Sequence, residues 1–174
     1  MERIPISEQG FARVLQELDR LKQERPSIIQ AIREAREEGD LSENAGYEAA
    51  RERQSMLEAR INYIESRMPH FNVVDITIMG GVKAVFGATV RVIDLDTELE
   101  KNFLLVGPDE TDFIPKARNP ISVFSPVGRA LLGKEEGDEV VVDVPRGRIS
   151  YEILGIRFDG VFIDPDAGRQ AGAQ

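Results

Sequence analysis

Two carboxylates, Asp40 and Glu43, have the residue type and the spacing best suited to chemistry in this chain. They fall at the predicted start of a helix, where residues three apart project from one side and can share a cation. Carboxylate and water oxygens are the ligands that Mg²⁺ prefers, so Mg²⁺ is the leading candidate. The same spacing is also typical of a capping box, with Asp40 as the N-cap and Glu43 reaching back to it. The two interpretations are compatible.

Other kinds of catalytic chemistry have little support. The chain has no cysteine and one histidine, His70, so thiol chemistry and disulfides are excluded and a zinc site has almost no ligands. Neither a glycine-rich phosphate-binding motif nor a G-x-S-x-G turn occurs. We interpret His70 as an exposed linker residue. The other acidic cluster, Glu135-Glu136 with Asp138-Glu139, is interpreted as a solvated turn.

Charge narrows the class of partner. The 174 residues include 22 Lys and Arg against 31 Asp and Glu, a net charge of −9. Such a balance disfavours direct, non-specific binding to nucleic acid, so DNA or RNA would be approached through a partner protein. The first ten residues do not resemble a signal peptide, and no run of about 18 apolar residues occurs. We therefore expect a soluble, cytoplasmic protein.

Two amphipathic helices must position the acids. Apolar residues recur at steps of three and four over residues 11–35, interrupted only by Arg25, and again over residues 47–68, interrupted only by Gln54. We expect Pro26 to kink the first helix without ending it, and Gly39 to end it in a left-handed conformation. The short connection predicts an antiparallel coiled coil over residues 1–70, about 35 to 40 Å long, with the acids at its tip.

From residue 71 the pattern changes to short β-rich runs separated by turn residues, which marks a domain boundary. An antiparallel sheet is predicted over residues 71–158, with one small helix at Val127 to Leu132 and a bulge at Leu154-Gly155. Residues 159–174 lack apolar periodicity and are predicted to be a flexible tail. The predicted strands are Val73 to Ile78, Ala88 to Ile93, Lys101 to Val106, Ile121 to Phe124, Glu139 to Val144 and Ser150 to Phe158.

Five stretches of the sequence form recognisable motifs: Gly39-Asp40-Leu41-Ser42-Glu43-Asn44-Ala45 with Tyr47 and residues 49–54, Phe86-Gly87-Ala88-Thr89-Val90, Ile121-Ser122-Val123, Ser125-Pro126, and residues 129–138. Together they resemble the Gre transcript cleavage factors, GreA type, over residues 1 to 158. One departure is Gly46, where that family usually has a larger, often acidic residue. A second is the extra segment after Phe158.

The resemblance implies an α+β protein, with an N-terminal antiparallel coiled coil and an FKBP-like C-terminal domain. It implies a transcription elongation factor that enters the secondary channel of bacterial RNA polymerase and stimulates Mg²⁺-dependent cleavage of backtracked nascent RNA, which rescues arrested complexes. Such a factor is not itself an enzyme. Asp40 and Glu43 match the family's tip acids, and Ser125-Pro126 match its docking loop.

The Mg²⁺ would be shared with the polymerase and not bound by the factor alone, which we expect to be a monomer without a membrane partner. Arg13, Arg20 and Lys22 are candidates for guiding the transcript. Three alternatives stay open: a channel-binding transcription inhibitor of the same fold, a prolyl isomerase or chaperone-like protein, and a passive coiled-coil adaptor in which the tip acids only cap a helix. The absence of Trp weakens the isomerase alternative.

Overall fold

The computed structural model describes residues 3–39 and 44–163. The described residues form two compact units, a helical one of residues 14–39 and 44–70, and a β-rich one of residues 3–13 and 71–163. The change of unit after residue 70 coincides with the predicted boundary, whereas residues 3–13 belong to the β-rich unit and not to the helical one. None of the helices in the described ranges has the length and apolar character needed to cross a membrane.

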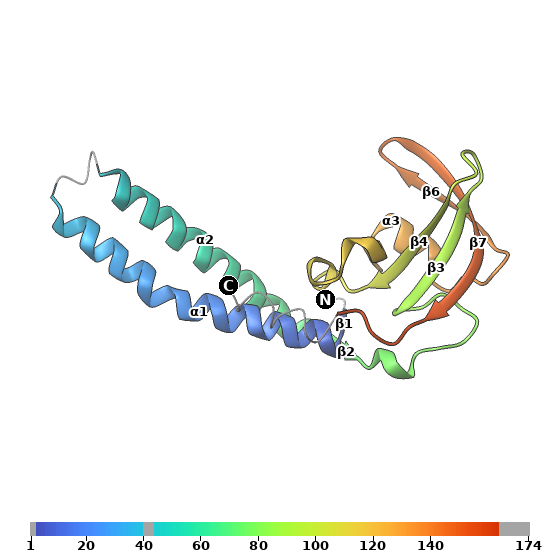
Figure 1. Cartoon of the computed structure of the whole chain (residues 1–174), viewed down its shortest axis with the longest axis horizontal. Coiled ribbons are helices and arrows are strands. Elements are labelled where there is room, and N and C mark those ends of the chain that lie inside the picture. The colour runs from blue at the N-terminus through green and yellow to red at the C-terminus, as the bar shows by residue number, and fades with distance from the viewer. Residues whose placement is uncertain (1–2, 40–43, 164–174) are drawn as a thin grey trace. The chain divides into compact units, whose positions relative to one another are not determined.

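The helical unit is a hairpin of α1 (Glu8–Glu37) and α2 (Ala45–Arg67), which lie side by side (Figure 1). Its seam consists of the apolar positions expected from the heptad pattern, which confirms the predicted coiled coil. The buried residues are Val14, Leu18, Leu21, Ile28, Ile32 and Ala35 from α1 and Ala50, Leu57, Ile61 and Ile64 from α2.

Arg25, the polar member of the first apolar series, is accommodated by a carboxylate of the opposite helix. Its Nε and Nη2 donate to the two oxygens of Glu58 at 2.7 and 3.0 Å. The hydrogen bond with Glu58 raises the pKa of Arg25. Further ion pairs join the helices between Arg60 and Glu17 at 2.9 Å and between Lys22 and Glu65 at 2.8 Å. Exposed pairs of this kind contribute little stability singly, but together they favour one register.

α1 continues through Pro26, as the resumption of the heptad after it predicts. Proline removes one backbone donor from a helix interior, which a long helix with a buried apolar face tolerates. The helix ends at Glu37, and Gly39 follows with φ +114°. This is the left-handed region that glycine adopts without a steric penalty, so the predicted stop signal is confirmed.

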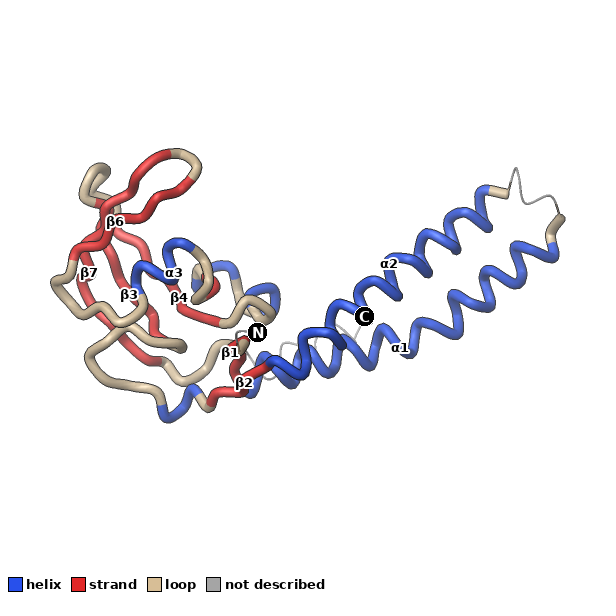
Figure 2. Tube along the Cα trace, turned by 180° about the vertical axis from the view of Figure 1, so that it is seen from behind, coloured by secondary structure: helices blue, strands red, loops and turns tan. Residues whose placement is uncertain are grey.

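The β-rich unit contains a five-stranded sheet in the order β5-β4-β3-β7-β6, with α3 (Pro126–Leu131) close to β6 and β5. Figure 2 shows how strongly the sheet is curved. Four strands are antiparallel as predicted, whereas β5 runs parallel to β4. The strands are β3 (Ala88–Asp94), β4 (Glu100–Val106), β5 (Pro120–Ser122), β6 (Glu139–Val144) and β7 (Gly147–Phe158).

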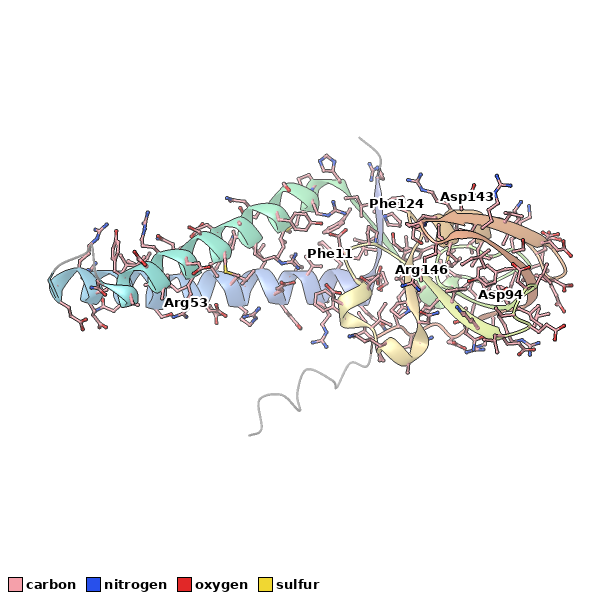
Figure 3. The ribbon with its side chains drawn as sticks, turned by 90° about the horizontal axis from the view of Figure 1, so that it is seen from above. Phe11, Arg53, Asp94, Phe124, Asp143 and Arg146 are labelled. Atoms are coloured by element: carbon pink, nitrogen blue, oxygen red, sulfur yellow. The ribbon has the colours of Figure 1, made fainter. Side chains whose placement is uncertain are left out.

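The predicted bulge is present in β7. Arg91 pairs with Gly155 and Val92 with Ile153, so Leu154 has no partner in the register of β3. The extra residue shifts the alternation of side chains between the two faces of the strand. At the outer edge of the sheet, Asp143 of β6, labelled in Figure 3, accepts a hydrogen bond from Arg148 at 2.9 Å.

The prediction of a strand over Val73 to Ile78 is wrong in its second half. The strand there is β2 (Phe71–Val74), and a 3₁₀ turn over Ile76–Ile78 follows it, with the side chain of Asp75 accepting from the amide of Thr77 at 3.0 Å. β2 pairs in parallel with β1 (Ile4–Ser7), a strand that the sequence analysis missed. Four residues carry too little alternation to be recognised, and the partner strand is more than sixty positions away.

Residues 159–163 are not a tail. Phe162 and Ile163 are 2% and 3% exposed, and the ring of Phe162 lies 5.9 Å from that of Phe86. Their backbone amides donate to Oε1 of Gln9 at 3.1 and 3.2 Å, and Arg118 pairs with Asp159 at 3.1 Å. The predicted tail is therefore wrong for these five residues, because apolar burial needs only two well-placed side chains. Residues 164–174 lie outside the described residues.

A buried carboxyl group fastens β1 and the start of α1 to the loop after β4. Glu110 is fully buried and accepts hydrogen bonds from the amide and hydroxyl of Ser7 at 3.0 and 2.5 Å and from the amide of Gly107 at 3.1 Å. The approach is close, since a Cβ on Gly10 would lie 2.6 Å from Glu110 Oε1 and one on Gly107 would lie 2.0 Å from the carbonyl oxygen of Pro5. Glycine is therefore required at both positions.

Burial raises the pKa of Glu110 above its usual value of 4.5, although the hydrogen bonds from Ser7 and Gly107 lower it. The folded state then takes up this proton at a higher pH than the unfolded chain. As pH falls through the raised pKa towards 4.5, the carboxyl therefore favours folding increasingly, and this gain is lost as pH rises. Glu110→Gln cannot titrate, so the free energy of unfolding of wild type minus that of the variant should increase as pH falls.

Urea denaturation at a series of pH values measures this difference. Glu136→Gln, at an exposed carboxylate of the turn after α3, is the matched control, because it makes the same substitution outside the core. A constant difference between wild type and Glu110→Gln over this range would contradict the prediction.

Phe162→Ala tests the packing of residues 159–163. Truncation of a buried Phe removes its transfer free energy and leaves a cavity, so the free energy of unfolding should fall by about 3 to 5 kcal/mol. Val161→Ala, at a side chain that is 45% exposed, should change it far less. Equal, small effects in chemical denaturation would mean that Phe162 does not belong to the core.

Candidate functional site

Asp40 and Glu43 lie outside the described residues, and the structure defines the two helix ends that flank them in sequence. α1 ends at Glu37 and α2 begins at Ala45. The N-cap of α2 is Asn44, whose Oδ1 accepts a hydrogen bond from the amide of Tyr47 at 3.0 Å.

The prediction that Asp40 caps the second helix is therefore wrong. A helix has one N-cap, and Asn is as favourable there as Asp, which is the signal that the sequence analysis passed over. The capping interpretation gave Asp40 and Glu43 a purely structural purpose. With Asn44 as the N-cap, capping of α2 no longer accounts for Asp40, and the role of Asp40 and Glu43 as metal ligands stays a prediction.

Asn44 also contacts the end of the other helix. Its Nδ2 donates to the carbonyl oxygen of Ala35 at 2.7 Å. Next to this bond, the guanidinium carbon of Arg36 lies 5.8 Å from the ring centroid of Tyr47, a distance typical of a cation–π contact. The described ends of α1 and α2 are thus joined by two polar contacts in addition to the apolar seam.

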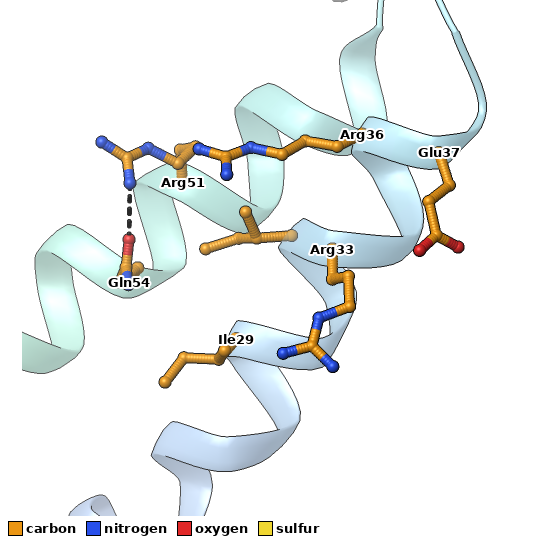
Figure 4. A pocket seen from close by; sticks show the side chains of 7 residues that line it. Ile29, Arg33, Arg36, Glu37, Arg51 and Gln54 are labelled. Atoms are coloured by element: carbon orange, nitrogen blue, oxygen red, sulfur yellow. Dashed lines mark hydrogen bonds between the residues drawn. The ribbon is translucent and has the colours of Figure 1, made fainter.

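A groove of about 460 Å³ lies on the hairpin near these helix ends (Figure 4). Three arginines surround it, Arg33 and Arg36 from α1 and Arg51 from α2, and Figure 4 shows Arg36 reaching across towards Arg51. Arg51 donates to Oε1 of Gln54 at 2.9 Å. Guanidinium groups bind phosphate and carboxylate oxygens in pairs, so the groove is suited to a phosphate-bearing ligand.

This arginine group was not predicted from the sequence. The predicted basic residues were Arg13, Arg20 and Lys22, and of these Arg20 pairs with Glu24 and Lys22 with Glu65. The sequence does contain a signal for the group, because residues 33 and 36 are one turn apart. Arg51 lies near these two arginines only because of the antiparallel register of the helices, and a local sequence pattern does not predict that register.

The donor chemistry of the tip fits a hard cation in part. Two carboxylates suit Mg²⁺, which usually takes one or two protein carboxylates and completes its six ligands with water or phosphate oxygens. Within residues 3–39 and 44–163, no group of three or more His, Asp or Glu side chains gathers in a way that could hold a metal ion. A metal ion at Asp40 and Glu43 therefore stays a prediction.

Ser125 and Pro126 begin α3 in the β-rich unit. Ser125 is the N-cap, with its hydroxyl accepting from the amide of Gly128 at 3.1 Å and donating to the carbonyl oxygen of Ser122 at 2.6 Å. Pro126 is exposed at the first helical position. A Cβ on Gly128 would lie 2.1 Å from the carbonyl oxygen of Ser122, so the turn is tightly closed. Ser125 is half-buried, so Pro126 is the exposed member of the pair at this corner.

Two further groups from the sequence, His70 and the acidic cluster of residues 135–139, lie in turns of the structure. His70 ends a 3₁₀ turn over Met68–His70 and is partly buried, not fully exposed as expected. The acidic cluster after α3 is an exposed turn, as predicted, in which Asp138 accepts from the amide of Glu135 at 2.8 Å.

Comparison with known proteins places both units in one family. The model described as "Transcription elongation factor, N-terminal" matches residues 4–73, and "Transcription elongation factor, GreA/GreB, C-term" matches residues 81–158. Transcription elongation factor GreA of Nitratidesulfovibrio vulgaris strain Miyazaki F is 64% identical over 160 residues, 92% of this chain and 98% of that protein. GreA of Thermodesulfovibrio yellowstonii is 50% identical over 159 residues, 91% and 99% of the two chains. A crystal structure of GreA factor homolog 1 of Thermus thermophilus aligns with 90% of this chain and 99% of its own, at 26% identity and a TM-score of 0.42.

Proposed function

Because the chain belongs to the GreA/GreB family of transcription elongation factors, we propose that it binds the secondary channel of bacterial RNA polymerase and stimulates the polymerase's cleavage of backtracked nascent RNA. Such cleavage would rescue arrested complexes. The factor would act as a monomer in the cytoplasm. It would not be an enzyme alone, because the active centre would be completed only in the complex.

One observation carries the proposal. The N-cap of α2 is Asn44, so the adjacent acids Asp40 and Glu43 are not needed to begin that helix. Carboxylates at the end of a helical hairpin, without a capping task, are suited to work on a partner. A pair of helices, each about 10 to 12 Å across, is narrow enough to enter a channel.

Asp40 and Glu43 would hold a Mg²⁺ ion together with carboxylates of the polymerase and a phosphate of the RNA. When bound, this ion would neutralise charge at the scissile phosphate and lower the pKa of the attacking water. The chain's own part is to deliver two anionic oxygens to the active centre and to keep them there. No ion needs to be bound before the complex forms.

The arginine groove would bind the transcript. Arg33, Arg36 and Arg51 place positive charge near the described ends of α1 and α2, on a protein whose net charge is −9. Backtracked RNA presents a chain of phosphates, and arginine pairs with phosphate oxygens at fixed geometry. The arginines would therefore hold the RNA in place while the carboxylates act at its scissile bond.

The corner at Ser125 and Pro126 would dock on the rim of the channel. The tightly closed turn keeps this surface rigid, which lowers the entropic cost of binding. In this arrangement the β-rich unit supplies affinity and the tip of the hairpin supplies chemistry.

The charge at the tip is tested by Asp40→Asn and Glu43→Gln. Neither substitution touches the cap contact of Asn44, so folding and occupancy of the polymerase channel should be unchanged. Each should lose most of its stimulation of transcript cleavage in stalled, backtracked complexes, with partial recovery at raised Mg²⁺, because an amide is a poorer ligand for a hard cation. Glu48→Gln removes a charge in the first turn of α2 and should cleave like wild type.

Wild-type cleavage rates from both tip variants would refute the role of the acids. A wild-type protein that occupies the channel and slows synthesis without shortening the transcript would instead be an inhibitor of the same fold.

Docking is tested by Pro126→Asp. Asp is well tolerated in the first turn of a helix, so α3 should remain intact while a charge is placed on the exposed corner. Affinity for the polymerase should fall, whereas the cleavage rate at saturating protein should stay near that of wild type. Ile78→Asp adds the same charge to a side chain that is 80% exposed elsewhere in the unit. Equal affinities of the two variants would exclude docking through Pro126.

A further inference from the structure

The side-chain amide of Asn44 joins the two helix ends between which the tip acids lie in the sequence. Its Oδ1 accepts from the amide of Tyr47 in the first turn of α2, and its Nδ2 donates to the carbonyl oxygen of Ala35 in the last turn of α1. The second bond, at 2.7 Å, connects the helices directly.

Both partners are backbone groups that a helix leaves unsatisfied. The first four amides and the last four carbonyls of an α-helix have no partner within the helix. The amide of Tyr47 belongs to the first set in α2, and the carbonyl of Ala35 belongs to the second set in α1. One short side chain therefore satisfies a donor on one helix and an acceptor on the other.

This double role explains why the residue is Asn. A short side chain that accepts at one atom and donates at another must carry an amide. Asp would keep the acceptor but would turn an oxygen towards the carbonyl of Ala35. Ser would keep the cap but is too short to offer a second polar atom across the hairpin. For capping alone, all three residues are favourable.

Two neighbouring features support the connection. Arg36 of α1 lies over the ring of Tyr47 of α2, a second contact across the same helix ends. Gly46 leaves room for the amide, because a Cβ there would lie 3.3 Å from Asn44 Oδ1, closer than an ordinary contact. Gly46 was a departure from the resembling family at the sequence level, and here it relieves crowding beside Asn44.

We infer that Asn44 is a positioning residue for transcript cleavage: its amide fixes the separation of the helix ends that carry the tip acids. This inference rests on the proposed function. In the sequence the acids lie between Glu37 and Asn44, so the separation of the two helix ends limits the positions that the acids can take. Misplacement by about 1 Å can cost roughly a hundredfold in rate.

Asn44→Asp and Asn44→Ser test the inference, because both keep an N-cap and both lose the bond to Ala35. Asp adds a negative charge near the acids and Ser does not, so a loss shared by the two variants cannot be a charge effect. Asn119→Asp is the matched control: it loses an equivalent bond, from Asn119 Nδ2 to the carbonyl oxygen of Asn102 at 2.9 Å, within the β-rich unit.

Transcript cleavage at saturating protein should fall roughly tenfold to a hundredfold in both Asn44 variants. Polymerase affinity and helical content should match wild type, and Asn119→Asp should cleave normally. Wild-type cleavage by either Asn44 variant, or a loss that is matched by a fall in affinity or helical content, would overturn the inference.

A distance measurement separates this inference from the proposed function. Because the chain has no cysteine, Glu37→Cys and Glu48→Cys accept spin labels only at these two helix ends. Pulsed electron–electron double resonance should show a narrow distribution of distances between the two labels when residue 44 is Asn. The distribution should be broader when residue 44 is Asp or Ser. An unchanged distribution would refute the connection. A wild-type protein that does not stimulate cleavage would refute the proposed function, whatever the distances show.

Discussion

The apolar seam between α1 and α2 is the constraint on which the candidate site depends. Within the described residues of the helical unit, each helix buries one apolar stripe and exposes the rest of its surface, so the two stripes depend on each other for burial. The seam is continued by paired charges, of which Arg25 with Glu58 replaces an apolar contact without leaving either group unpaired. The described parts of α1 and α2 are thus held together by both apolar and paired polar contacts.

The net charge of the molecule is negative, whereas the charge of the arginine groove is positive. A net charge of −9 keeps the chain away from nucleic acid in general, whereas three arginines near the tip form a local positive groove. Salt screens charges that are more than about 8 to 10 Å apart, so the groove acts on a ligand that has already been brought close. A partner protein would thus be needed to bring the groove close to a nucleic acid.

The β-rich unit depends in turn on polar groups buried where chain segments meet. Glu110 collects three donors from Ser7 and Gly107, and a group buried in this way stabilises only while every contact is made. The side chain of Gln9 likewise accepts hydrogen bonds from the backbone amides of Phe162 and Ile163. Through these contacts residues 7–9 are held to Glu110 and to residues 162–163, although these segments are far apart in sequence.

The sequence by itself determined the features that follow from local periodicity and turn chemistry. Both helices, the stop at Gly39, the bulge near Gly155 and most strands follow from spacings of two, three and four residues and from the conformational freedom of glycine. The residues with metal-binding chemistry, Asp40 and Glu43, were also evident from sequence, and their role stays a prediction.

Only the tertiary structure decided what depends on distant partners. β1 became a strand because β2 lies beside it, and Phe162 became a core residue because Phe86 is its neighbour. The N-cap of α2 is Asn44 and not the predicted Asp40. The side-chain amide of Asn44 also donates to the carbonyl oxygen of Ala35, which lies on the other helix. The groove of Arg33, Arg36 and Arg51 exists only in the antiparallel register. A local pattern contains no information on such partners, since the free energy that selects them comes from contacts formed when the chain folds.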